Sequence, residues 1–321
     1  MMKKAKRICG VWMLLSMVLI GGCGKPSEEI LEVAALKGPT GIGMVKMLQD
    51  VGKSENPKYN MVLYQSPDEI LGKVVSGEVD LACIPSNLGA VLYNKTEGGI
   101  KFLATNTLGV LYIMENGNTI KNLKDLNNRT IVASGKESTP EFVLSYILNN
   151  TGLLANEEVS MEFMGNHADV LSKLVTEEDT VALLPEPFVT TALNKNDAIR
   201  VVVDVNEVWE TLNHLELPMG ILIANAQVLE ERPEEIEQFL KDYKESVDFV
   251  NQHVEEASQL VAQFEIMPSA ELAQQAIPKC HIVYEVSKEA KDALQQFYKI
   301  LEEANPRAVG GKVPDENFYT Y

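Results

Sequence analysis

The residues best suited to bind a ligand lie in six short segments, where an apolar, strand-like run gives way to a helical pattern. These segments are rich in Gly, Ser, Thr and Asn, whose backbone N–H and hydroxyl groups suit anionic or polar small molecules. In an open α/β sheet the ligand crevice lies beyond the carboxyl ends of the strands, where such segments meet. The six segments are residues 37–41, 66–68, 85–87, 134–139, 165–167 and 185–188.

Nine side chains in these segments are candidate ligand contacts. Lys37 could supply positive charge for a carboxylate, sulfonate or phosphate, and His167 could sense a proton on the ligand. Glu186, held between two prolines, could instead accept hydrogen bonds from an amino group on a heterocycle, so Lys37 and Glu186 point to opposite kinds of ligand. The candidates are Lys37, Thr40, Ser66, Ser86, Asn87, Ser138, Thr139, His167 and Glu186.

The same residue types also have ordinary structural roles. Ser, Thr, Asn and Gly are common in caps and turns, and loop lysines are mostly solvated. An acidic residue in the first turn of a helix complements the helix dipole, and a histidine there is often a simple cap. The recurrence of such segments in both halves of the chain nevertheless favours a ligand-binding cleft.

Signatures of known enzyme classes are missing from the sequence. It contains no Gly-x-Ser-x-Gly elbow, His-Glu-x-x-His, Walker loop or Gly-x-Gly-x-x-Gly. The run GPTGIG at residues 38–43 lacks the Gly-Lys-Ser/Thr ending of a phosphate loop, and the four histidines have no metal-ligand spacing. We therefore expect a binding protein without cofactor or metal. The alternative is an extracellular enzyme whose catalytic residues come from separate loops, but no motif in the sequence supports it.

The N-terminus has the pattern of a secretory signal peptide. Four basic residues lie within residues 1–7, an apolar run follows at residues 11–20, and Gly21-Gly22 precedes Cys23. The apolar run is too short for a membrane span of about 20 residues. Residues 20–23 also resemble a bacterial lipobox, in which cleavage before Cys23 is followed by acylation of that cysteine. We expect a signal peptide at residues 1–22, then lipidated Cys23 and a polar linker at residues 23–29, and an extracytoplasmic protein held at the membrane by lipid.

The overall charge excludes one class of partner. The chain has 321 residues and a formal net charge of −18, which becomes −22 when the basic signal peptide is removed. Such an acidic body is repelled by phosphate backbones, so we expect no nucleic-acid binding. Beyond Cys23, the cysteines Cys83 and Cys280 could pair in an oxidising compartment, or could be buried thiols.

The order of elements is typical of an α/β fold with two similar halves. Strands are predicted at residues 30–36, 59–64 and 79–84, each followed by a helix. A second set of strands is predicted at residues 130–133, 159–163 and 181–184, again each followed by a helix. The third strand of each set ends in a proline just before its helix.

Two extended apolar segments, at residues 100–114 and 219–224, could cross between the halves as a hinge. From residue 233 the chain is mainly helical and would return to the first half. We expect a first lobe of residues 30–107 and 225–321 and a second lobe of residues 108–224. One continuous domain with a helical extension is the alternative.

These motifs resemble those of solute-binding lipoproteins of bacterial ABC importers, in the nitrate, sulfonate, taurine and thiamine-precursor group of periplasmic binding proteins. The resemblance covers essentially the whole mature chain. It rests on LKGPTGIG at 36–43, GEVDLA at 77–82, PSN at 85–87, IKNLKDL at 120–126, STPE at 138–141, LPEP at 184–187, NP at 305–306, GGKVP at 310–314 and FY at 318–319.

The resemblance implies a type II periplasmic-binding-protein fold: two doubly wound lobes joined by a two-strand hinge, with the C-terminal helices packed on the first lobe. It implies a monomer that closes on a small ligand and docks on a membrane permease of an ABC importer. Family contacts would come from Thr40, Ser86, Asn87, Ser138, Thr139 and Glu186.

The ligand implied by the resemblance would be a sulfonate, nitrate or related anion. A pyrimidine or other heterocycle is the alternative, although the cysteine-rich pyrimidine motif is missing, and a ligand-sensing module is a further one.

Overall fold

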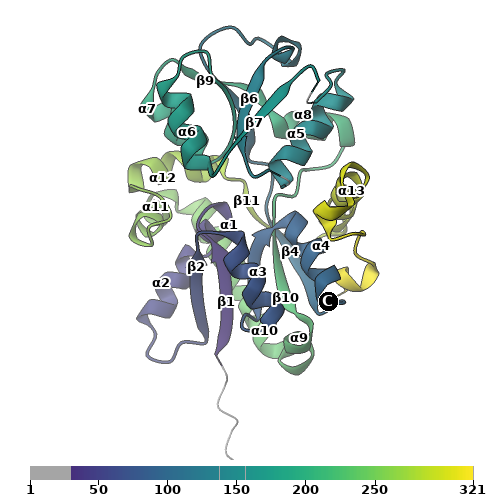
Figure 1. The fold of residues 1–321 in the computed structure, drawn as a ribbon. Helices are drawn as coiled ribbons and strands as arrows, with labels where there is room; N and C mark the ends of the chain where they lie inside the picture. Colours follow the sequence, from purple (N-terminus) through teal and green to yellow (C-terminus); the bar gives the residue numbers. More distant parts are fainter. Residues whose placement is uncertain (1–29, 137, 156, 321) are drawn as a thin grey trace, which may run out of the picture.

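The computed structural model describes residues 30–136, 138–155 and 157–320. Its two mixed β-sheets lie one above the other, each with helices on its faces (Figure 1). The fold is therefore the predicted mixed α/β architecture with two lobes. The predicted signal peptide, Cys23 and the linker at 23–29 lie outside the described residues.

The lower sheet in Figure 1 has six strands in the order β11-β4-β10-β3-β1-β2. Strand β1 pairs in parallel with both β2 and β3, whereas β10 pairs antiparallel with β3 and β4. The strands are β1 (Leu31–Leu36), β2 (Tyr59–Tyr64), β3 (Leu81–Pro85), β4 (Ile100–Thr107), β10 (Gly220–Asn225) and β11 (Ile282–Glu285). We call this sheet and its helices the first lobe, residues 30–107 and 220–320.

The upper sheet has five strands in the order β7-β6-β8-β5-β9. Strand β6 pairs in parallel with β7 and β8, and β5 pairs antiparallel with β8 and β9. The strands are β5 (Leu111–Asn116), β6 (Thr130–Ser134), β7 (Ser160–Met164), β8 (Val181–Pro185) and β9 (Ile199–Asp204). This sheet and its helices form the second lobe, residues 111–213.

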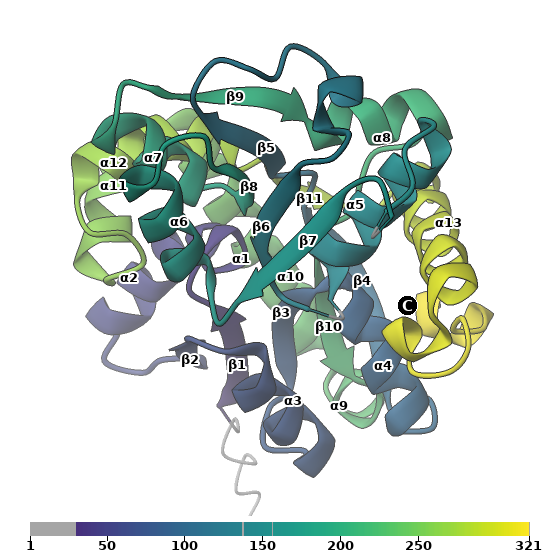
Figure 2. The ribbon, with the colours of Figure 1, turned by 45° about the horizontal axis from the view of Figure 1, so that its top comes forward.

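The helices cover both faces of each sheet, as Figure 2 shows from a second angle. None of the described helices is both long and apolar enough to cross a membrane. In the first lobe they are α1 (Pro39–Ile42), α2 (Val45–Lys53), α3 (Pro67–Ser76), α4 (Ser86–Lys95), α9 (Ala226–Glu231), α10 (Pro233–Gln252), α11 (Val254–Gln263), α12 (Ala270–Ala276) and α13 (Lys288–Ala304), with 3₁₀ turns η2 (Ile277–Lys279), η3 (Pro306–Val309) and η4 (Glu316–Tyr319). In the second lobe they are η1 (Leu123–Leu126), α5 (Thr139–Asn150), α6 (His167–Thr176), α7 (Phe188–Lys195) and α8 (Val205–Asn213).

Local sequence explains where helix α3 begins and ends. The Ser66 hydroxyl accepts a hydrogen bond from the Asp68 N–H at 3.2 Å, and Pro67 occupies the first helical position. Both features satisfy the geometry of a helix start. Gly77 ends the helix in the left-handed conformation (φ 76°), which costs glycine little. The predicted start of this helix is confirmed.

The predicted boundary between the lobes at residue 224 is wrong, because β10 is a strand of the first sheet. Residues 220–224 therefore lie within the first lobe and do not cross between the lobes. Strands β9 and β11 and helix α8 were not predicted either. Strands β9 and β11 lie at sheet edges, where their short apolar runs carry a weak signal.

The chain crosses between the lobes at residues 108–110 and again at residues 214–219. At the first crossing Leu108 N–H donates to the His281 carbonyl at 3.1 Å. The His281 imidazole Nδ1 lies 2.5 Å from the Gly109 carbonyl oxygen. A side chain at Gly109 would lie only 2.0 Å from Asn206 Oδ1. The crossing is therefore short and closely packed from both lobes.

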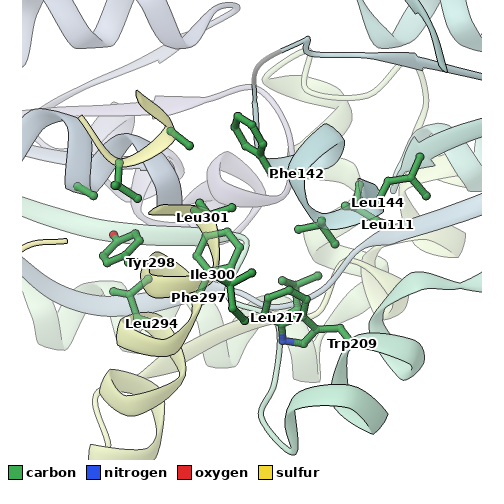
Figure 3. Packing of buried hydrophobic residues seen from close by; sticks show 14 of the residues in the cluster. Leu111, Phe142, Leu144, Trp209, Leu217, Leu294, Phe297, Tyr298, Ile300 and Leu301 are labelled. Carbon is green, nitrogen blue, oxygen red and sulfur yellow. The ribbon is translucent and has the colours of Figure 1, made fainter. Parts of the chain in front are cut away.

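A single apolar cluster runs through both lobes along helix α13 (Figure 3). Trp209 of α8 packs edge-on against Phe297 of α13, with ring centroids 5.8 Å apart, and Tyr146 of α5 lies 5.2 Å from Trp209. Helix α13 also packs on α4 of the first lobe. The C-terminal helices thus cover the first lobe, as predicted, and one of them also holds an edge of the second.

The two cysteines of the folded region are buried thiols in the structure. Cys83 Sγ lies 3.8 Å from the Tyr243 hydroxyl, and burial raises the pKa of Cys83 to about 12. Cys280 is also fully buried and its pKa is raised for the same reason. Neither thiol is poised to react at neutral pH, because the thiolate is the reactive form.

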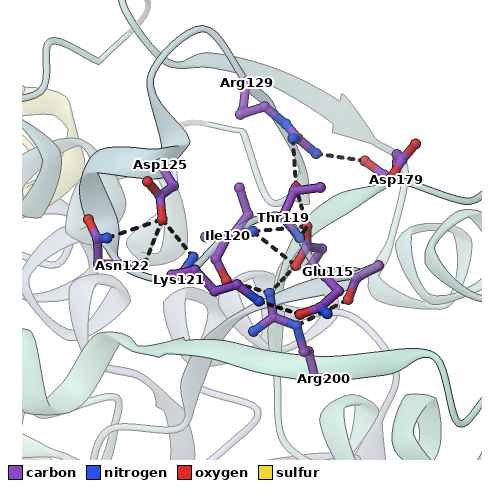
Figure 4. A network of polar contacts seen from close by, with 11 residues as sticks. Glu115, Thr119, Ile120, Lys121, Asn122, Asp125, Arg129, Asp179 and Arg200 are labelled. Carbon is purple, nitrogen blue, oxygen red and sulfur yellow. Dashed lines mark hydrogen bonds and ion pairs between the residues drawn. The ribbon is translucent and has the colours of Figure 1, made fainter.

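Glu115 organises the end of the second lobe away from the crossings (Figure 4). Its fully buried carboxylate accepts hydrogen bonds from the Thr119 and Ile120 N–H groups at 2.8 and 3.1 Å and forms an ion pair with Arg200. Burial alone would raise the pKa of Glu115, but these donors lower it below its ordinary value. The carboxylate therefore stabilises the fold in its ionised form.

We predict that Glu115→Gln lowers the free energy of unfolding at pH 7 by about 3–5 kcal/mol, the range for breaking a buried ion pair by removing one partner. Since the pKa of Glu115 is lowered, its contribution is present at neutral pH and is lost as the pH falls through that lowered pKa. The difference from wild type should thus shrink in acid. Urea denaturation at several pH values measures it.

The matched control is Glu162→Gln, which removes an ion pair with Lys173 (2.7 Å) that is exposed to solvent. Exposed pairs contribute about 0–1 kcal/mol. Equal losses in the two variants would contradict the role assigned to Glu115.

Candidate functional site

The carboxyl ends of parallel strands from both sheets meet between the lobes (Figures 1 and 2). A buried contact there links Thr139, at the start of α5, to Asn87, in the first turn of α4. Thr139 Oγ1 donates to Asn87 Oδ1 at 3.0 Å, and both residues are buried. This hydrogen bond brings a segment of each lobe into direct contact, as the order of elements predicts.

Three first-lobe candidates lie at this meeting point or beside it. Ser86 and Asn87 open helix α4, and Ser86 Oγ is fully buried without a hydrogen-bond partner in the described chain. Thr40 is buried on α1, and its methyl group lies against Gly220, where a Cβ would come within 2.9 Å. A buried hydroxyl without a partner costs free energy unless something else satisfies it.

The other two first-lobe candidates already have partners. Lys37 Nζ lies 3.9 Å from the carboxylate of Glu265, which is largely exposed. Ser66 caps helix α3. Both side chains are partly exposed, so these contacts agree with the ordinary structural roles and leave ligand contact untested.

In the second lobe Ser138 and Thr139 form the start of α5. Gly135 adopts a left-handed conformation (φ 77°), and the Ser138 hydroxyl donates to its carbonyl oxygen. This turn lets strand β6 end and α5 begin at the face of the second lobe that meets the first lobe (Figure 1). Thr139 is only 3% exposed.

His167 lies one strand further along the same edge, at the start of α6. Its Nδ1 is 2.5 Å from Ser134 Oγ at the end of β6, and its ring lies 5.3 Å from that of Phe188. Burial lowers the pKa of His167 to about 4. The imidazole is therefore neutral at physiological pH. Ser134 was within a predicted segment but was not among the candidates.

Glu186 begins the turn into α7 and is 1% exposed. Its carboxylate accepts hydrogen bonds from the N–H and the hydroxyl of Thr190, both at 3.0 Å. Burial raises the pKa of Glu186, and those donors together with Lys279 and His281 only partly offset the rise. The carboxylate thus satisfies donors in the first turn of the following helix, α7, which agrees with an ordinary structural role for an acidic residue at a helix start.

The buried polar side chains of the described residues include hydroxyls, amides and carboxylates but no Lys or Arg. Two surface hollows of about 600 and 330 Å³ lie around Tyr59 in the first lobe, and neither is lined by a candidate residue. Among the described residues no group of three or more His, Cys, Asp or Glu could hold a metal ion. The interlobe face offers neutral hydrogen-bond donors.

Residues 46–276 match the model of a family described as ABC transporter, phosphonate, periplasmic substrate-binding protein. The chain belongs to this family. The binding protein is thus the extracytoplasmic substrate-binding component of an ABC importer, which binds a small ligand and interacts with the permease. No match was found among curated proteins.

Solved structures show the same fold. An ABC transporter protein from Parabacteroides distasonis is 24% identical, with a TM-score of 0.76, covering 90% of this chain and 98% of the other. The periplasmic aliphatic sulphonate binding protein SsuA from Escherichia coli is 18% identical (TM-score 0.73; 89% and 91% covered). The alkanesulfonate-binding protein SsuA from Xanthomonas axonopodis pv. citri, bound to MOPS, is 12% identical (TM-score 0.66; 89% and 94% covered).

We predict that Glu186→Gln stabilises the ligand-free binding protein at pH 7.5. The raised pKa means that ionising Glu186 costs stability as the pH rises through that pKa, and the amide avoids this cost. We expect the melting temperature to rise by a few degrees, since about 1 kcal/mol corresponds to about 2–4 °C in a protein of this size. Near pH 4 the two proteins should melt alike.

Differential scanning calorimetry at both pH values makes the comparison, with the exposed Glu178→Gln as control. A variant that melts lower than wild type at pH 7.5 would show that the ionised carboxylate is needed as a helix cap.

Proposed function

We propose that the binding protein is a lipid-anchored receptor that captures a small oxyanion, of the sulfonate or phosphonate class, between its lobes. The observation that carries this proposal is the hydrogen bond from Thr139 to Asn87 across the lobes. It brings the starts of two helices, one from each lobe, together in a place without solvent. Such a place suits a ligand that accepts hydrogen bonds from both sides.

The type of donor favours an anion over a cation. Helices α4 and α5 both begin here, and the first N–H groups of a helix carry partial positive charge. The unpartnered Ser86 hydroxyl adds a further donor. An oxyanion held by N–H and O–H groups needs no buried Lys or Arg, and none lies among the buried residues described.

The crossings between the lobes support capture by closure. Both connections, at residues 108–110 and 214–219, are short, so the lobes can rotate about them as bodies. Closure removes water from the ligand, which strengthens its hydrogen bonds to the protein. Helix α13 stays in contact with both lobes and limits the direction of this rotation.

The position of the N-terminal strand supports the proposed lipid anchor at Cys23. Strand β1 starts at Leu31 and ends at the interlobe face, so its first residue lies at the opposite end of the first lobe (Figure 1). A short linker from Cys23 would join the fold there. The interlobe face would stay open to ligand while the lipid holds the molecule at the membrane.

Isothermal titration with ethanesulfonate, methylphosphonate, nitrate, the neutral ethyl methyl sulfone and the pyrimidine cytosine tests the ligand class. We expect binding of at least one oxyanion and none of the sulfone, which lacks the charge. We propose that the Thr139 hydroxyl, which donates to Asn87 without ligand, turns to the anion in the complex. In Thr139→Ala the affinity for that oxyanion should then fall about tenfold or more, because a hydrogen bond to a charged group contributes about 1.5–3 kcal/mol.

The matched control is Thr211→Ala. Thr211 is exposed on α8, and its hydroxyl donates a hydrogen bond to the Glu207 carbonyl of the same helix. The variant should therefore bind the oxyanion with the affinity of wild type. Binding of a pyrimidine in place of every oxyanion would contradict the proposal.

A further inference from the structure

Three side chains from successive strands meet at the interlobe edge of the second sheet. Ser134 ends β6, His167 follows β7 and Phe188 follows β8, and these strands are neighbours in the order β7-β6-β8. Ser134 Oγ lies 2.5 Å from His167 Nδ1, and Phe188 packs against the imidazole ring. The His167 ring is therefore positioned by a hydrogen bond at Nδ1 and by packing against Phe188.

The hydrogen bonds of this pair leave one ring nitrogen free. Ser134 is 3% exposed, and His167 Nδ1 is its only side-chain partner among the described residues. No other hydrogen bond to the imidazole is found in the described chain, so Nε2 has no protein partner there. No charged group contributes to the lowered pKa of His167, which has burial as its cause.

We propose that Ser134 is a positioning residue: its hydroxyl donates to Nδ1 and so fixes neutral His167 with its proton on Nε2. The Nε2–H group then donates a hydrogen bond to the bound oxyanion. This inference rests on the proposed function, since it assigns a donor to the same ligand.

The opposite arrangement conflicts with an anionic ligand. If Nδ1–H donated to Ser134, Nε2 would present a lone pair to the ligand and would accept from a donor such as an amino group. The neutral imidazole has only one N–H, whereas the Ser134 hydroxyl can either donate or accept a hydrogen bond. The tautomer of His167 therefore reports which kind of ligand the site accepts.

A neutral donor also fits the surroundings. Burial disfavours the imidazolium, so His167 offers a hydrogen bond without charge, as the hydroxyls of Thr139 and Ser86 do. Affinity then does not depend on protonating His167. Beside many functional histidines a carboxylate or a backbone carbonyl contacts Nδ1, and here the Ser134 hydroxyl does so.

Long-range ¹H–¹⁵N NMR of the purified protein, with and without ethanesulfonate and methylphosphonate, tests the tautomer. We expect the Nε2–H form of His167 in both states, and a mixture of tautomers in Ser134→Ala. A wild-type Nδ1–H form, or an unchanged tautomer in Ser134→Ala, would overturn the inference.

Titration of the same anions measures the effect on binding. We expect Ser134→Ala to lose about threefold to tenfold in affinity, which is the range for one neutral hydrogen bond. His167→Ala should lose more, and His167→Gln should retain most of the affinity because its amide offers an N–H donor. The control is Ser246→Ala, equally buried on α10 but bonded to the Gly43 carbonyl at 2.7 Å, which should bind like wild type.

The two proposals fail in different ways. Anion binding that is unchanged in Ser134→Ala and His167→Ala would overturn the role of these residues and leave oxyanion capture intact. Suppose instead that the folded protein binds none of the anions but shows the Nε2–H tautomer of His167. Oxyanion capture and the contact of His167 with the ligand would then be overturned, and the hydrogen bond from Ser134 to Nδ1 would still stand.

Discussion

The arrangement of this binding protein depends on how its interlobe face satisfies polar groups away from water. Parallel strands of two sheets end at this face, and each is followed by a helix whose first N–H groups lack partners within the helix. Hydroxyl and amide side chains at this face satisfy some of its polar groups by hydrogen bonding to one another, as Thr139 and Asn87 do. The remaining donors, with Ser86 as the clearest case, are what an anion can satisfy.

The rest of the fold keeps the two sets of strand ends facing one another. Gly109 allows the first crossing to pack closely on Asn206, and the His281 ring contacts the same segment from the first lobe. Helix α13 joins the lobes through Trp209 and Phe297. At the far end of the second lobe, Glu115 and Arg200 hold a loop that plays no part in the ligand face. Stability and binding are thus assigned to different ends of this lobe.

Much of this could be predicted from the sequence, because strand and helix periods and caps are local signals. The start of α3 at Ser66 and Pro67 is an example. Strand β10 was assigned to the wrong lobe because its partners β3 and β4 lie more than a hundred residues away. Ser134 was passed over for a similar reason, since its contact with His167 follows from the pairing of β6 with β7 and is invisible in either segment alone.

The most direct test of the account is a distance between the lobes with and without ligand. Spin labels at Val75→Cys on α3 and Ser172→Cys on α6, in a protein of residues 24–321, report it. Both sites are exposed, and the native cysteines of that part of the chain, Cys83 and Cys280, are buried. The account predicts that an oxyanion which binds will shorten and narrow the distribution measured by pulsed electron paramagnetic resonance. An unchanged distribution at saturating ligand would contradict closure of the lobes around it.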